Sequence, residues 1–139
     1  MADGELSLTH DGNRALREAE NICQRADVQI LAAEHLLAGA MLAATAECPG
    51  IPALATLEAA AAAIHGQGME PSESNVMWGS SAREALNATV GQLREKGVTM
   101  VTARLIALGV IASGEVNPEF YEVLGMTRKE LLVVLSGGG

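Results

Sequence analysis

The fold is decided by residues 8–41, LTHDGNRALREAENICQRADVQILAAEHLLAGAM. Apolar residues recur there at steps of three and four, which is the period of an amphipathic helix. The first run comprises Ala15, Leu16, Ala19, Ile22, Cys23 and Ala26, and the second comprises Leu36, Leu37, Ala40 and Met41. Residues 27–32 between the two runs are typical of a turn. The stretch therefore predicts two helices joined by a short connection, with Thr9 or Asp11 as the cap of the first helix.

The same order of features returns about 70 residues later. The second half again has a long helix beginning near Ala85-Leu86, a short turn ending at Met100, and a helix rich in Leu and Ala. Self-similarity of this kind is the signature of a structural repeat. We therefore predict an all-α fold in which two four-helix units, related by a pseudo-twofold axis, close over one aliphatic core. The predicted divisions are a first repeat at 7–66, a linker at 67–79, a second repeat at 80–136 and a disordered glycine tail at 137–139.

Local signals mark the helix starts of the second half. Residues 81–84 (Ser-Ala-Arg-Glu) and 127–130 (Thr-Arg-Lys-Glu) both match the capping box that opens a helix. Asn117-Pro118 is a cap followed by proline at the first helical position. Met77 and Trp78 lie in a loop-like stretch, and we expect both to anchor that stretch onto the core.

Composition excludes several functional classes. The formal net charge is −8, which disfavours nucleic acid and anionic membranes as partners. Hydrophobic residues make up 49% of the 139-residue chain and aromatic residues only 2%, so small aliphatic side chains have to fill the core. Cys23 and Cys48 are too few for a disulfide framework and are predicted to be reduced thiols in the cytoplasm. The polar, acidic start is unlike a signal peptide, and no apolar stretch is long enough to span a membrane.

Both halves resemble the Clp N-terminal repeat, in which a Phe-Thr pair starts the first helix and Thr-Glu-His-Leu-Leu opens the second. The first half carries the corresponding motifs Leu8-Thr9, Ala15-Leu16, Ala19 and Glu34-His35-Leu36-Leu37. In the second half, the family's closing segment is matched by Val123-Leu124-Gly125-Met126-Thr127 with Leu131 and Leu135. The resemblance covers roughly residues 7–136 and implies an eight-helix double repeat. It also implies a docking role, because these domains sit above an unfoldase ring and receive adaptors or tagged substrates.

The predicted function is therefore that of a non-enzymatic binding module without its ATPase. The sequence has no G-x-x-x-x-G-K-[ST] loop to cradle a nucleotide, which excludes ATPase activity of this chain. The partners implied by the resemblance are a Clp ATPase, an adaptor or a tagged protein substrate.

Four residues form the candidate site for a peptide or for phosphoarginine: Thr9, Glu34, His35 and Arg104. In relatives that bind phosphoarginine, an acidic residue at the Glu34 position pairs with the guanidinium. The Thr at the Thr9 position meets the phosphate there, so the resemblance implies one site in the first half. Ala103-Arg104 replaces Glu-His in the second half, where Arg104 would repel a guanidinium. A plainer interpretation is also open, in which Thr9 is a helix cap and Glu34 is favoured by the helix dipole.

Two rival functions remain open at this point. A helical small-molecule binder would need a deep pocket, for which the place to look is near His35 and Cys23. A structural dimerisation module would need no site at all. The histidines and cysteines lack the close spacing of metal ligands, and no G-x-S-x-G motif is present, so we predict neither a metal, a cofactor nor nucleophilic catalysis.

Overall fold

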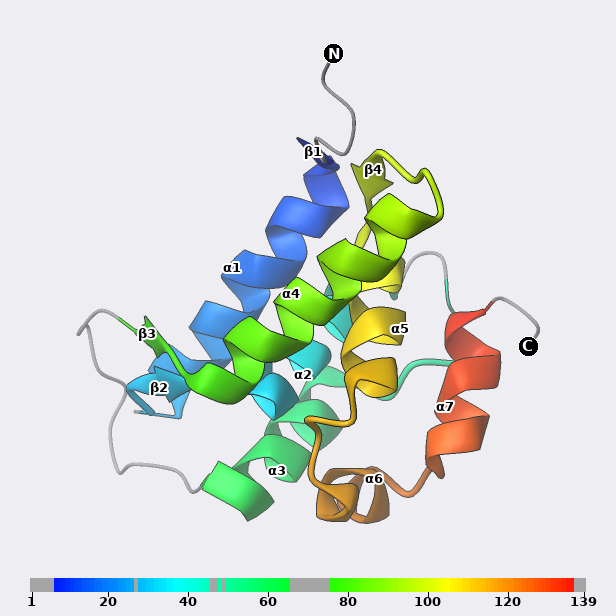
Figure 1. Ribbon diagram of the computed structural model, residues 1–139. Coiled ribbons are helices and arrows are strands. Elements are labelled where there is room, and N and C mark those ends of the chain that lie inside the picture. Colours follow the sequence, from blue (N-terminus) through cyan, green and yellow to red (C-terminus); the bar gives the residue numbers. More distant parts are fainter. Residues whose placement is uncertain (1–6, 27, 46–47, 49, 66–75, 137–139) are drawn as a thin grey trace.

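The structure is a computed structural model that describes residues 7–26, 28–45, 48, 50–65 and 76–136. These residues form seven helices and four two-residue strands (Figure 1). The helices are α1 (His10–Arg25), α2 (Ala33–Ala43), α3 (Leu54–His65), α4 (Ser80–Glu95), α5 (Ala103–Ser113), α6 (Pro118–Leu124) and α7 (Arg128–Leu135). The strands are β1 (Ser7–Leu8), β2 (Ile30–Leu31), β3 (Met77–Trp78) and β4 (Met100–Val101). The all-α class is confirmed, and the short strands are a feature that helical periodicity did not predict.

The internal repeat is visible as a constant offset between equivalent elements. The series β1, α1, β2, α2 recurs as β3, α4, β4, α5, and every start is displaced by 70 positions, as from His10 to Ser80 and from Ala33 to Ala103. After α2 and α5 the halves diverge. Among the described residues, the first half continues with one helix, α3, whereas the second continues with two, α6 and α7. Four helices were predicted in each unit; within the described residues the first unit has three and the second has four.

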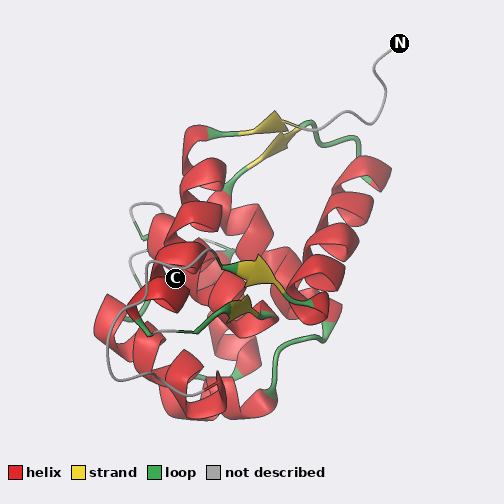
Figure 2. Ribbon diagram, turned by 90° about the vertical axis from the view of Figure 1, so that its left-hand side faces the viewer, coloured by secondary structure: helices red, strands yellow, loops and turns green. Residues whose placement is uncertain are grey.

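Strand pairing joins the two halves to each other. β1 pairs in parallel with β4, and β2 pairs in parallel with β3, so each pair takes one strand from either half. The backbone N–H of Thr9 donates to the carbonyl of Val101 at 3.0 Å, and the equivalent N–H of Gly79 donates to Leu31 at 2.8 Å. The two pairs lie at opposite ends of α1 (Figures 1 and 2). Each strand stops after two residues because a helix follows almost at once.

The core is built around α2 and α5, which pack on each other, with α1 packed mainly on α2 and α4 mainly on α5. α2 is apolar on nearly all sides and almost entirely buried, as expected for a central helix. Glycine lets the outer helices approach closely. A Cβ atom on Gly39 would lie 2.4 Å from the backbone nitrogen of Ala19, and one on the equivalent Gly109 would lie 2.1 Å from Oγ1 of Thr89. Close packing of small residues thus replaces the bulky aromatic side chains that the chain lacks.

The capping predictions have mixed outcomes. The box at 127–130 and the cap at Asn117 are confirmed. The box at 81–84 is wrong, because α4 begins after Gly79 and the Ser81 hydroxyl instead accepts a hydrogen bond from the backbone of Ala33. Met77 does not anchor the chain, since it is 70% exposed, whereas Trp78 is partly buried. Most of the predicted linker and the whole glycine tail lie outside the described residues.

Candidate functional site at the junctions between the halves

The two strand pairs define two equivalent junctions. The first junction comprises β1, β4 and the starts of α1 and α5, and the second comprises β2, β3 and the starts of α2 and α4. At the first, a carboxylate oxygen of Asp11 accepts from the backbone N–H of Ala103 at 3.4 Å. At the second, the Ser81 hydroxyl accepts from Ala33 at 3.0 Å. Each junction thus uses a side chain of one half to cap a helix of the other.

Thr9 lies in the first junction as the cap of α1. Its Oγ1 accepts from the backbone N–H of Gly12 at 3.1 Å and donates to the Asp11 carboxylate. The same oxygen lies 3.3 Å from the carbonyl oxygen of Val101 in β4. The predicted capping role is confirmed, and Thr9 also helps to fix α1 against the second half.

Arg104 belongs to the same junction as Thr9, because it follows Ala103 at the start of α5. The residue is partly buried, and its Nε is a buried nitrogen without a hydrogen-bond partner among the described residues. A buried donor that is left unpaired costs free energy, commonly about 1–3 kcal/mol. Within the described part of the chain, Nε of Arg104 is therefore unsatisfied, in contrast to the carboxylate of its equivalent Glu34.

Glu34 lies in the second junction and is only 3% exposed. One carboxylate oxygen is 2.6 Å from Nε2 of His65 at the end of α3, and the other accepts from the backbone N–H of Asn117 at 2.6 Å. Burial alone would raise the pKa of Glu34, but the hydrogen bonds from His65 and Asn117 outweigh it and hold the pKa below its ordinary value. The ionised carboxylate therefore ties three helices together and has no access to a guanidinium from outside.

His35 is also part of the supporting structure rather than of the surface. It is 1% exposed, and its Nδ1 accepts from the backbone N–H of Ala32 at 3.0 Å. Its ring centroid is 4.7 Å from that of His65. Burial, and secondarily the neighbouring His65, lowers the pKa of His35 to about 4, against a smaller opposing effect of Glu34. The imidazole is therefore neutral near neutral pH.

The structure thus groups the four predicted residues in two pairs. Thr9 lies with Arg104 in the first junction, and Glu34 lies with His35 in the second. Thr9 and Glu34 are not brought together, because the two junctions stand at opposite ends of α1 (Figure 1). The physical reason is the exchange between halves, since each helix start is completed by a segment of the other repeat.

A groove that the sequence reasoning missed runs along the outer face of α1. It is open, has a volume of about 700 Å³ and is lined by His10, Asn13, Leu16, Arg17, Glu20 and Trp78. The indole nitrogen of Trp78 donates to the carboxylate of Glu20 at 3.3 Å, which fixes the ring against the helix. The residues from α1 recur at three- and four-residue steps. The sequence pattern predicts this polar stripe, but it contains no signal that Trp78 lies at one end of it.

Comparison with known proteins gives one informative result. No protein-family model matches the sequence, and no curated protein matches it. A similar solved structure is the crystal structure of the N-terminal domain of the caseinolytic protease associated chaperone ClpD from Arabidopsis thaliana. The superposition has a TM-score of 0.72 and covers 98% of this chain and 95% of that chain, at 15% sequence identity. This chain has the fold of a Clp N-terminal domain.

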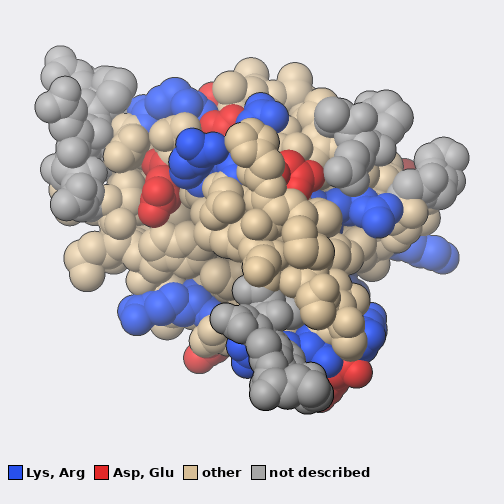
Figure 3. All heavy atoms as spheres, turned by 90° about the horizontal axis from the view of Figure 1, so that it is seen from above, with Lys and Arg blue, Asp and Glu red and all other residues tan. Residues whose placement is uncertain are grey.

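At 15% identity the likeness concerns the fold alone and transfers no binding residue. No helix in the described part of the chain is long and apolar enough to cross a membrane. The described residues also contain no group of three or more His, Cys, Asp or Glu side chains that could hold a metal ion. Basic and acidic side chains both occur on the upper face, and in several places they lie side by side (Figure 3).

Proposed function

We propose that this chain is a protein-binding module of the Clp N-terminal type, which receives adaptors or tagged protein substrates for a Clp unfoldase and performs no chemistry itself. The observation that carries the proposal is the open groove of α1 and Trp78 on a Clp N-terminal fold. A groove that offers an aromatic ring, an aliphatic side chain and an exposed cation is suited to a protein segment.

The chemistry of the groove favours a particular kind of segment. Leu16 and Trp78 are partly buried and offer apolar contact. Arg17 is exposed, whereas Glu20 is engaged by the indole of Trp78. A segment that carries an apolar side chain next to a carboxylate would satisfy both features, because the carboxylate can pair with the guanidinium of Arg17.

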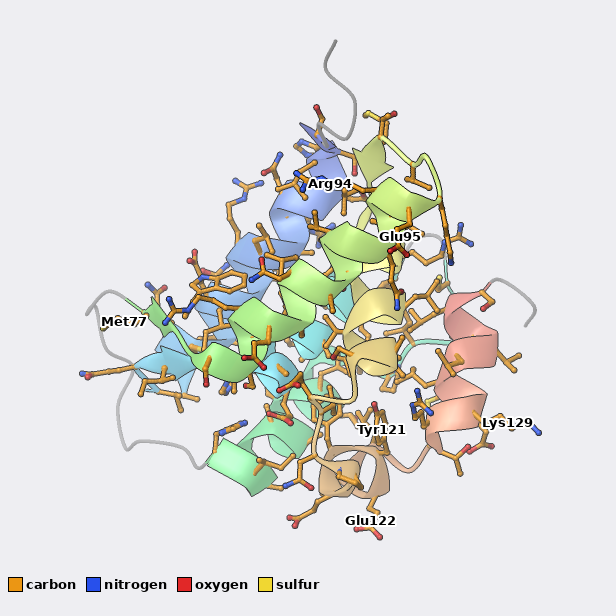
Figure 4. The ribbon with its side chains drawn as sticks, in the orientation of Figure 1. Met77, Arg94, Glu95, Tyr121, Glu122 and Lys129 are labelled. Atoms are coloured by element: carbon orange, nitrogen blue, oxygen red, sulfur yellow. The ribbon has the colours of Figure 1, made fainter. Side chains whose placement is uncertain are left out.

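The second junction extends this surface. Ile30 and Met77 are register partners in the β2–β3 pair, and they are 60% and 70% exposed. Met77 lies at the outer edge of the molecule (Figure 4). Two large apolar side chains presented together to solvent are typical of an interaction surface. Met77 directly precedes Trp78 in β3, so one bound segment could contact both the groove and this edge.

The four residues predicted from the sequence take different places in this proposal. Thr9 and Arg104 remain candidates for direct contact with a partner, and Arg104 would attract a carboxylate or phosphate rather than a guanidinium. Glu34 and His35 are assigned to support of the second junction.

The proposal is tested by charge reversal in the groove with a matched control. Arg17→Glu places the opposite charge on the groove, while Arg83→Glu makes the same change at an exposed position of α4 that does not line it. Each variant is immobilised, and the Clp ATPase, adaptors and Clp substrates retained from lysate are quantified. We expect wild type and Arg83→Glu to retain Clp components and Arg17→Glu to lose them by about tenfold.

Two results would contradict the proposed function. One is the absence of every Clp component from the wild-type sample. The other is equal retention by Arg17→Glu, which would move the binding surface away from α1. Circular dichroism of each variant separates a binding defect from unfolding.

A further inference from the structure

A separate cavity lies on the other side of the molecule's first half, between the end of α1 and α3. Its volume is about 240 Å³, and its walls come mainly from Ile22, Ala26, Ala59, Ala62 and the ring of His35. No residue of the α1 groove takes part in it. Alanine methyl groups thus line a space that larger side chains would fill.

His35 gives this cavity a polar group with a defined role. Its Nδ1 is already used as the acceptor for Ala32, and a neutral imidazole with an acceptor Nδ1 carries its proton on Nε2. Among the described residues no hydrogen-bond partner of Nε2 is found. The side chain is almost wholly buried yet forms part of the cavity wall. An N–H donor on a cavity walled largely by alanine side chains offers a hydrogen bond to an acceptor that enters.

The mouth of the cavity offers no net charge. Glu58 belongs to the lining, and its carboxylate is bound by Nε of Arg25 at 2.8 Å. The two charges offset each other, so neither a cation nor an anion gains a free partner there. An uncharged occupant suits the surroundings best.

We propose that the α1–α3 cavity binds a small uncharged molecule with an apolar body and one hydrogen-bond acceptor, which receives the Nε2 proton of His35. Size sets the class of ligand. The volume of about 240 Å³ exceeds the roughly 150 Å³ that accommodates benzene in a protein core and falls below the roughly 300 Å³ at which drug-sized sites begin. A single substituted ring matches that interval. The site is independent of the groove and of the proposed protein-docking function.

The test uses two probes of the same shape. Acetophenone has a carbonyl acceptor, and α-methylstyrene replaces that oxygen with a methylene group. Binding is followed by NMR through the methyl signals of Ile22 and Ala61, which line the cavity. We expect saturable shifts with acetophenone and an affinity about threefold to tenfold higher than that of α-methylstyrene, the difference expected for one neutral hydrogen bond.

A pair of variants locates the binding. Ala59 and Ala63 are both exposed positions of α3, but only Ala59 belongs to the cavity lining, so Ala59→Leu narrows the cavity and Ala63→Leu makes the same change outside it. Acetophenone binding should fall at least fivefold in Ala59→Leu and stay unchanged in Ala63→Leu. Binding that survives in Ala59→Leu, or the absence of saturable shifts in the wild type, overturns the site. Equal affinity for the two probes overturns the role of His35.

Discussion

The two junctions have the same backbone arrangement, but they differ in nearly every side chain that contacts it. Both have a parallel strand pair and equivalent backbone hydrogen bonds, from Thr9 to Val101 in one and from Gly79 to Leu31 in the other. A threonine caps α1, whereas Gly79 begins α4 without any side-chain cap. The shape of the fold is therefore set by backbone pairing and by close helix packing, and these leave the junction side chains free to diverge.

The starts of α2 and α5 show how far that divergence goes. In α2, Glu34 is buried and paired and His35 accepts the backbone N–H of Ala32. At the equivalent positions of α5 stand Arg104 and Leu105, and the cap is supplied by the hydroxyl of Thr102. The start of α2 thus depends on a buried carboxylate and a buried imidazole of its own first turn, whereas α5 has the hydroxyl of Thr102 and the Asp11 carboxylate of the other half. The four predictions that follow test this contrast, from the largest expected effect to the smallest.

The close helix packing at glycine, which both halves share, should be the feature most sensitive to substitution. Gly39→Ala would press a methyl group against the backbone of Ala19, and a backbone cannot move aside. We expect a loss of about 3 kcal/mol in the free energy of unfolding, measured by urea denaturation. Gly109→Ala would meet Oγ1, Cγ2 and Cβ of the buried Thr89, and no rotation moves the Cβ aside, so its loss should be of similar size. A loss below about 1 kcal/mol for either substitution would contradict this account of the packing.

Acid should destabilise the first half through His35. Its pKa is about 4 in the fold against 6.5 ordinarily, so the unfolded chain takes up a proton first as the pH falls. The stability that His35 contributes is present above pH 6.5 and is lost down to about pH 4, which amounts to about 3 kcal/mol. Urea denaturation across this range measures the loss.

The control for this prediction copies the second half into the first. Ala32→Thr combined with His35→Leu gives α2 the cap and the apolar residue that Thr102 and Leu105 give α5. This double variant should unfold with a much flatter pH dependence between pH 6.5 and 4. Glu34 adds its own loss in stronger acid, because its lowered pKa makes its contribution disappear only as the pH falls through the folded value. An unchanged slope in the double variant would remove His35 as the cause.

Glu34 should matter for stability near neutral pH. Glu34→Gln keeps the size of the side chain but removes the charge that His65 and the N–H of Asn117 share. We expect a loss of about 2 kcal/mol, typical of a buried hydrogen bond to a charged group. Glu95→Gln, at an exposed position of α4, should change stability by less than about 0.5 kcal/mol. Equal effects of the two substitutions would show that the carboxylate is not the tie between α2, α3 and α6.

The sequence predicts the fold but not the contacts of the site, and this difference has a physical cause. Helix periods, caps such as Asn117 and the repeat offset are local features, and they are readable because each depends on neighbours in the chain. Asp11 and Ser81 each accept a hydrogen bond from a helix start of the other half, and these bonds join residues far apart in sequence. A local pattern such as the capping box at 81–84 cannot reveal them. Glu34 was likewise placed on a binding surface, because no sequence pattern links it to His65 and Asn117.

The smallest predicted effect should have the opposite sign. Arg104→Met removes a guanidinium whose Nε is buried without a hydrogen-bond partner in the described structure, and it keeps a long, flexible apolar side chain. We expect the free energy of unfolding to rise by about 1 kcal/mol in urea denaturation, while Arg83→Met on the exposed face of α4 changes little. A loss of stability would mean that Arg104 is held by its own chain and not left open toward a partner. A gain, together with the loss in Glu34→Gln, would show that this position of the repeat contributes to stability in the first half and not in the second.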